Sequence, residues 1–183
     1  MKKIIISLFL IVLLLTGCNN KENDKILQDY PNINDEHHVY KVATYHEVID
    51  LLTNKTGVVI FGFSTCPYCQ AVMPLLNQSA KEVNYRRILY FDIYEMRKDK
   101  TDEYLNLVEI ITKQVDDLAY DEEGTPRIVV PDVYFVKDGT IVAHHIATFK
   151  DENGNWIRNL SNDQQEELKT IYKSYFQLIT NEK

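Results

Sequence analysis

One stretch of sequence decides the fold: residues 58–69 read VVIFGFSTCPYC. The first six residues form a continuous β-prone apolar run, which is typical of a strand buried on both faces. Cys66 and Cys69 follow after a two-residue turn, and a helical stretch extends from them to about Glu82. A Cys-x-x-Cys at a strand-to-helix junction is a redox motif rather than a random pair of thiols.

The position of each cysteine predicts its role. Cys66 should lie at the helix N-cap, where unpaired backbone N–H groups and the helix dipole stabilise a thiolate. Pro67 suits the first helical turn because its missing N–H is not needed there, and Pro67 and Tyr68 form the active-site turn. We therefore expect Cys66 to be the exposed nucleophile. Cys69, one turn later, is within disulfide reach and is the expected resolving thiol.

Metal binding is the main alternative explanation for these cysteines, and the sequence argues against it. A closed structural zinc site needs four Cys or His ligands, and Cys18 is the only other cysteine. The histidine pairs at 37–38 and 144–145 consist of adjacent residues, which point to opposite faces of a strand. A purely structural disulfide in so short a ring would be strained and labile, which itself suits redox function. We expect no metal and no cofactor.

Composition narrows the class of protein further. The chain has 183 residues, 45% hydrophobic and 26% charged, which is the balance of one globular domain. Its formal net charge is −7, so no broad basic field is present to attract nucleic acid. We expect a monomer.

The N-terminus has the pattern of an export signal. Lys2 and Lys3 precede an apolar run over residues 4–15, which is too short for a transmembrane helix. The run ends in Leu-Thr-Gly-Cys at Cys18, which resembles the lipobox of bacterial lipoproteins. The resemblance implies a signal peptide over residues 1–17 and a lipid on Cys18. One lipidated residue would hold the protein at the outer face of the bacterial cell membrane. The polar residues 18–37 are predicted to be a flexible tether.

The remaining chain, residues 38–183, alternates between strand and helix patterns and predicts an α/β domain. Strands are expected at 39–42, 58–63, 88–93, 131–136 and 141–146. Capping signals begin helices after Thr44, Thr101 and Ser161, and the helix after Thr101 should run to Leu118. This helix belongs to an insertion at about residues 94–124.

At this point the chain resembles the thioredoxin superfamily. Pro74 lies where thioredoxins carry the proline that kinks the active-site helix, and VPDVYFVKDG over 130–139 resembles the family's cis-proline and hairpin. The resemblance implies a thioredoxin-like fold, with a central mixed sheet flanked by helices and a helical insertion before the cis-proline. It also implies that Pro131 is cis and that the backbone of Val130 binds substrate. Pro126 is the rival for the cis bond, although only Pro131 precedes a strand and turn with that spacing.

Several positions depart from the family pattern. Thioredoxins keep a buried Asp six residues before the first cysteine, and Ile60 stands there in this chain. Asp132 is a candidate substitute as proton acceptor, or simply a solvated residue at a strand start. Pro-Tyr between the cysteines is the glutaredoxin dipeptide, yet the glutathione-binding Gly-Gly is absent. A lipoprotein with this insertion is most similar to the bacteriocin transport accessory proteins of Gram-positive bacteria.

The sequence thus predicts an extracytoplasmic thiol–disulfide oxidoreductase that acts on protein disulfides and is recycled by a redox partner protein. The alternative is a non-catalytic thioredoxin-like module in a secretion or bacteriocin-maturation assembly. Reduction and oxidation both remain open, since Cys-x-x-Cys proteins span about −270 to −120 mV.

Overall fold

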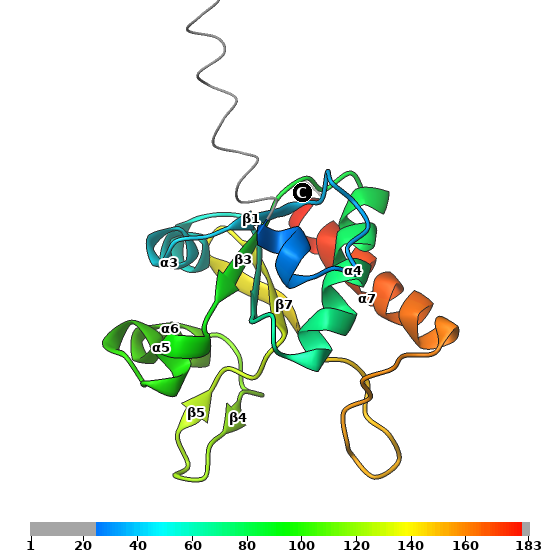
Figure 1. The fold of residues 1–183 in the computed structure, drawn as a ribbon. Helices are drawn as coiled ribbons and strands as arrows, with labels where there is room; N and C mark the ends of the chain where they lie inside the picture. The colour runs from blue at the N-terminus through cyan, green and yellow to red at the C-terminus, as the bar shows by residue number, and fades with distance from the viewer. Residues whose placement is uncertain (1–24, 181–183) are drawn as a thin grey trace, which may run out of the picture.

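The computed structural model of the chain describes residues 25–180 (Figure 1). Its centre is a five-stranded mixed sheet with the strand order β1-β3-β2-β6-β7. The strands are β1 (Tyr40–Val42), β2 (Gly57–Gly62), β3 (Ile88–Asp92), β6 (Asp132–Lys137) and β7 (Thr140–Ile146). β1, β3 and β2 are parallel, whereas β6 and β7 run antiparallel to their neighbours.

Helices cover both faces of this sheet (Figure 1). α4 (Pro67–Glu82) and α7 (Asn162–Thr180) pack together on one face. α3 (Tyr45–Asn54) covers the other face and contacts α6 (Asp102–Thr112). This strand order and helix placement form a thioredoxin-like α/β fold, which confirms the predicted fold class.

The insertion lies between β3 and β6. It contains α5 (Tyr94–Lys98), α6 and a two-stranded ribbon of β4 (Ala119–Tyr120) and β5 (Pro126–Arg127). α6 ends six residues earlier than the apolar pattern predicts. The Gln114 side chain explains the early end, because its amide nitrogen donates to Leu52 O and its oxygen accepts from Ile141 N. The chain is thereby fixed to α3 and β7 just after the helix.

Local capping follows the sequence signals closely. Thr44 and Glu47 form a complete capping box at α3, and Ser161 and Gln164 exchange the same pair of hydrogen bonds at α7. The Thr101 hydroxyl caps α6 by accepting from Tyr104 N. The predicted hairpin joins β6 to β7 at Gly139, whose φ is +75°, and a Cβ there would clash with α3 backbone at 2.2 Å.

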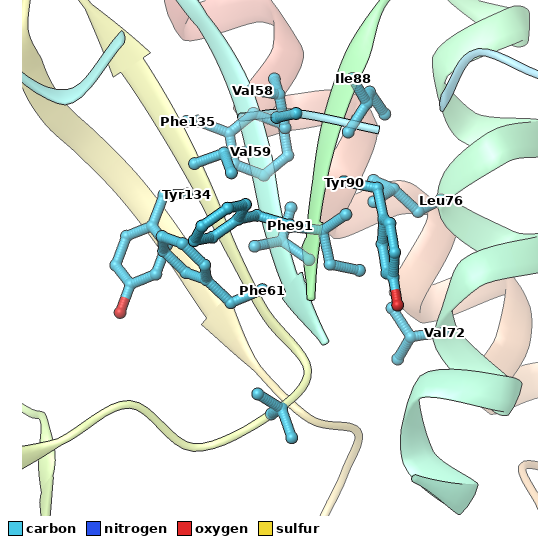
Figure 2. Close-up of a cluster of buried hydrophobic side chains, with 14 of the residues drawn as sticks. Val58, Val59, Phe61, Val72, Leu76, Ile88, Tyr90, Phe91, Tyr134 and Phe135 are labelled. Carbon is cyan, nitrogen blue, oxygen red and sulfur yellow. The ribbon is translucent and has the colours of Figure 1, made fainter. Parts of the chain in front are cut away.

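The alternation of side chains along the strands separates two buried layers. Figure 2 shows Phe61, Phe91 and Tyr134 on one side of the sheet and Tyr90 on the other, toward α4. The register agrees, because Phe61 pairs with Phe91 and with Asp132, while Ile60 pairs with Tyr90. Each face of the central strands is therefore covered by its own layer of buried side chains. A polar group in one layer is separated by the sheet from the groups in the other.

The second half of the predicted tether is not a flexible spacer. Residues 1–24, which include the predicted signal peptide and Cys18, lie outside the described residues. Residues 25–37, however, pack against the domain: residues 25–29 are helical, and Ile26, Tyr30 and Ile33 are buried in the core. Few apolar residues are present, but they are spaced to face one surface. Within residues 25–180, every helix is too short or too polar to cross a membrane.

Candidate active site

The two cysteines lie at the N-terminus of α4, as the sequence predicts. Cys66 is the N-cap residue, its N–H donates to Phe63 O at 3.1 Å, and Pro67 occupies the first turn. Both cysteines are thiols in this structure. Cys66 is only 6% exposed and Cys69 is fully buried, so the expected exposed nucleophile is instead largely covered. Cys66 is still the more accessible of the two sulfurs.

The environment of Cys66 favours its thiolate. The Cys69 thiol, which can donate to Cys66, and the backbone N–H groups of Cys69 and Tyr68 lower the pKa of Cys66 to about 6, against an opposing effect of burial. The charge of Arg97 acts in the same direction. At neutral pH Cys66 is thus mostly ionised, which is the state a thiol needs to attack a disulfide.

Cys69 behaves in the opposite way. Burial raises its pKa well above the usual range, and the hydrogen bond and charge of Cys66 raise it further. Cys69 therefore keeps its proton while Cys66 is a free thiolate. Two chemically equivalent residues are made unequal by one helical turn, with the more acidic thiol of Cys66 nearer the surface and the protonated thiol of Cys69 behind it.

The cis-proline loop closes the site from β6. The Val130–Pro131 peptide bond is cis, which confirms the choice of Pro131 over Pro126. Pro126 lies in β5 of the insertion ribbon. The carbonyl oxygen of Val130 is 3.6 Å from Cys66 Sγ. The loop thus presents a backbone carbonyl directly beside the Cys66 sulfur.

The insertion holds this loop in place, a role that the sequence did not indicate. The Tyr104 hydroxyl of α6 accepts from Ile128 N at 3.1 Å, and Arg97 of α5 donates to Ile128 O at 3.3 Å. The Arg97 guanidinium also lies 4.9 Å from the centre of the Phe63 ring. Arg97 therefore links the loop to the end of β2 and brings its positive charge toward both cysteines. No local motif identifies it.

Two further contacts tie the active-site turn to distant segments. The Tyr68 hydroxyl donates to Trp156 O at 3.4 Å, in the polar loop before α7. The Gln70 amide donates to Ser64 O and to Asp29 O, both at 2.7 Å. The second of these bonds reaches the N-terminal segment, which was expected to be a tether. The active-site helix is thus in direct contact with residues just after the membrane anchor.

Asp132 is not the proton acceptor of Cys69. Its carboxylate lies on the side of the sheet away from Cys69, with Phe61 and Tyr134, and it is fully buried. It accepts from the Tyr134 hydroxyl at 2.5 Å and pairs with His144 Nδ1 at 3.1 Å. The alternative prediction, that Asp132 is a solvated residue at the start of a strand, is also wrong because Asp132 is buried. His144 and Asp132 instead form a hydrogen-bonded pair between β7 and β6, in which burial raises the pKa of Asp132 and Asp132 in turn raises the pKa of His144.

Residues 1–19 match the family model described as the prokaryotic membrane lipoprotein lipid attachment site. The chain is therefore a lipid-anchored, extracytoplasmic bacterial protein with a thioredoxin-like fold. No curated protein matches the chain.

Similar solved structures include two thioredoxins. Thioredoxin 2 from Pseudomonas aeruginosa in its reduced form is 20% identical with a TM-score of 0.38, over 74% of this chain and 94% of that chain. A mutant thioredoxin from Halobacterium salinarum is 17% identical with a TM-score of 0.39, over 75% and 88%. A chain from a study of thiol resolution in yeast mitochondrial 1-Cys peroxiredoxin is 16% identical with a TM-score of 0.38, over 64% and 86%. The fold assignment itself rests on the strand order and helix placement.

Proposed function

We propose that this chain is an extracytoplasmic thiol–disulfide oxidoreductase that exchanges disulfides with protein substrates through Cys66 and Cys69. The observation that carries the proposal is the inequality of the two thiols. Cys66 is held near pKa 6 at a helix N-terminus, while the pKa of the buried Cys69 is raised. This is the arrangement that a two-step exchange requires, because one thiol must attack and the other must wait.

In the reductive direction the Cys66 thiolate attacks a substrate disulfide, forms a mixed disulfide and releases one substrate thiolate. Cys69 then loses its proton and attacks Cys66 Sγ, which forms the Cys66–Cys69 disulfide and releases the second substrate thiolate. The substrate gains two electrons, and a redox partner protein restores the dithiol. The oxidative direction is the same sequence in reverse.

The cis-proline loop binds and orients the substrate. The Val130 carbonyl lies 3.6 Å from Cys66 Sγ, so a peptide that hydrogen-bonds to the Val130 backbone would hold its own sulfur next to Cys66. Pro131 keeps this backbone facing the cysteines. The lipid, which we place on Cys18, would confine the reaction to substrates at the membrane surface.

Insulin reduction by the full chain in detergent, with dithiothreitol as electron donor, tests the proposal. We expect wild type to accelerate insulin precipitation and Cys66→Ser to fall to the uncatalysed background. A wild type that is indistinguishable from Cys66→Ser, in this assay and in the oxidation of a reduced test protein, would favour the non-catalytic module. If wild type is active, trapping with Cys69→Ser in cells would identify the substrate. The resting redox state of that substrate would give the direction of exchange.

A further inference from the structure

The raised pKa of Cys69 conflicts with its proposed role as the resolving thiol. Cys69 must lose a proton before it can attack, yet burial and the neighbouring Cys66 both oppose its ionisation. Ile60 occupies the position where thioredoxins keep a carboxylate, and Asp132 lies on the wrong side of the sheet. A backbone hydrogen bond from Phe63 and the charge of Arg97 lower the pKa of Cys69 against these effects, and any further side-chain stabilisation of its thiolate must come from another polar group.

Two tyrosines share the space around the Cys69 sulfur. This space lies above Gly62, whose missing side chain leaves room for all three groups. A Cβ on Gly62 would be 3.1 Å from Cys69 Sγ, 3.7 Å from the Tyr30 hydroxyl oxygen and 3.7 Å from Cε2 of Tyr90. Tyr90 projects from β3 on the α4 side of the sheet (Figure 2). The Cys69 thiol and the Tyr30 hydroxyl thus both lie within 4 Å of one point above Gly62.

The two tyrosine hydroxyls are joined to each other. Tyr30 donates to the Tyr90 oxygen at 3.0 Å, and their rings meet edge to face with centroids 5.6 Å apart. Both side chains are buried. Burial raises the pKa of both hydroxyls, so each stays neutral, and in the described state the single Tyr30 proton is donated to Tyr90. A neutral donor is what stabilises a thiolate without adding charge to the core.

We propose that Tyr30 is a positioning residue for the redox step: with Tyr90 it controls the protonation of Cys69, in the role that a buried carboxylate would otherwise have. This inference rests on the proposed function. When the mixed disulfide forms, the substrate thiolate released in the first step takes up the Cys69 proton, and the Tyr30 hydroxyl turns from Tyr90 to donate to the Cys69 thiolate. The Cys69 sulfur then bonds to Cys66 Sγ, the bond to the substrate sulfur breaks, and the released thiolate carries the electron pair away.

The other titratable groups around Cys69 do not take this role. Cys66 is the bonding partner itself, and Arg97 from α5 acts only through its charge. The Tyr172 hydroxyl of α7 is buried and has no hydrogen-bond partner among residues 25–180. Asp92 and Asp29 influence the tyrosine pair, not the sulfur directly. Tyr30 and Tyr90 are the groups linked into a chain.

The N-terminal segment, residues 25–33, holds Tyr30 in position. The helix at residues 25–29 ends at Tyr30, whose N–H donates to Ile26 O at 2.8 Å, and Ile26 and Ile33 anchor the segment in the core. Gln70 of the active-site helix donates to Asp29 O at 2.7 Å. The residues next to the membrane anchor therefore belong to the active site rather than to a spacer.

Stopped-flow reaction of the reduced full chain in detergent with an aryl disulfide separates the two chemical steps. The first coloured thiolate is released when Cys66 attacks, and the second when Cys69 resolves the mixed disulfide. For Tyr30→Phe we expect the first phase to be unchanged and the second to slow about tenfold, with its pH midpoint about one unit higher. Tyr90→Phe should change the second phase in the same direction.

Tyr40→Phe is the matched control, because it also removes a buried tyrosine hydrogen bond, to Met73 O, away from the sulfurs. It should leave both phases at the wild-type rate. A second phase within twofold of wild type in Tyr30→Phe, or an equal slowing of both phases, would overturn the inference. The assay needs no protein substrate, so failure of the insulin assay alone would count against the proposed function and not against the role of Tyr30.

Discussion

The two faces of the central sheet carry two different polar clusters. On the α4 face, the Cys69 thiol and the Tyr30–Tyr90 pair are all neutral groups. On the α3 face, Asp132, His144 and Tyr134 form a hydrogen-bonded network that carries charge. A one-residue alternation along β2 and β6 separates them.

The two buried clusters differ in how fully their polar atoms are hydrogen-bonded. Asp132 has its two carboxylate oxygens occupied by Tyr134 and His144, so it is committed to holding β6 against β7. The tyrosine pair is less polar and leaves Cys69 able to change its protonation state. We infer that the charged cluster maintains structure and the neutral cluster serves the reaction, and the following predictions separate these roles.

The largest expected effect is the removal of the buried carboxylate. Asp132→Ala leaves His144 and the Tyr134 hydroxyl without their partner, and we expect the free energy of unfolding to fall by about 3 kcal/mol. Chemical denaturation measures this loss. Asp117→Ala is the control, because Asp117 binds the other nitrogen of His144 from an exposed position and should cost less than about 1 kcal/mol. Equal losses in both variants would remove the distinction between buried and exposed partners.

The pH dependence of stability should report the same network. Asp132 and Asp117, against the effect of burial, raise the pKa of His144 from 6.5 to about 9. A raised pKa means that protonated His144 stabilises the fold fully below pH 6.5, and that this contribution disappears as the pH rises through 9. We expect a loss on the order of 2–3 kcal/mol between these values. Denaturation midpoints at several pH values should show the decline in wild type and a flatter profile in His144→Gln.

The last prediction concerns the α4 face of the sheet. Gly62→Ala puts a Cβ 3.1 Å from Cys69 Sγ, closer than ordinary contact, so the thiol or the tyrosine pair must shift. We expect a destabilisation of about 1–3 kcal/mol from overpacking. The resolution phase of the aryl disulfide reaction should slow while the Cys66 phase is kept. An unchanged resolution phase would show that the space above Gly62 does not govern Cys69.

Much of the fold was predictable because its signals are local. The capping boxes at Thr44 and Ser161, the buried strand before Cys66 and the Lys-Asp-Gly turn each depend on residues within a few positions. Pro131 was identified by its spacing to the strand and turn that follow. The geometry of the redox motif is likewise local, since one helical turn separates Cys66 from Cys69.

The rest depends on contacts that no local pattern encodes. Tyr30 lies in a polar stretch, and its partner Tyr90 is sixty residues away. Arg97 reaches the active site only because the insertion folds back over the cis-proline loop. The face on which Asp132 lies depends on strand register, and a shift of one residue would have put it on the α4 side of the sheet.

The central claim, that one turn of helix makes Cys66 reactive and keeps Cys69 protonated, can be tested by a pH titration of thiolate absorbance in the reduced full chain. Wild type should show one thiolate forming below pH 8 with a midpoint of about 6. Cys66→Ser should abolish that transition. A Cys66 midpoint near the ordinary thiol value of about 8.5, or two thiolates forming together, would contradict it.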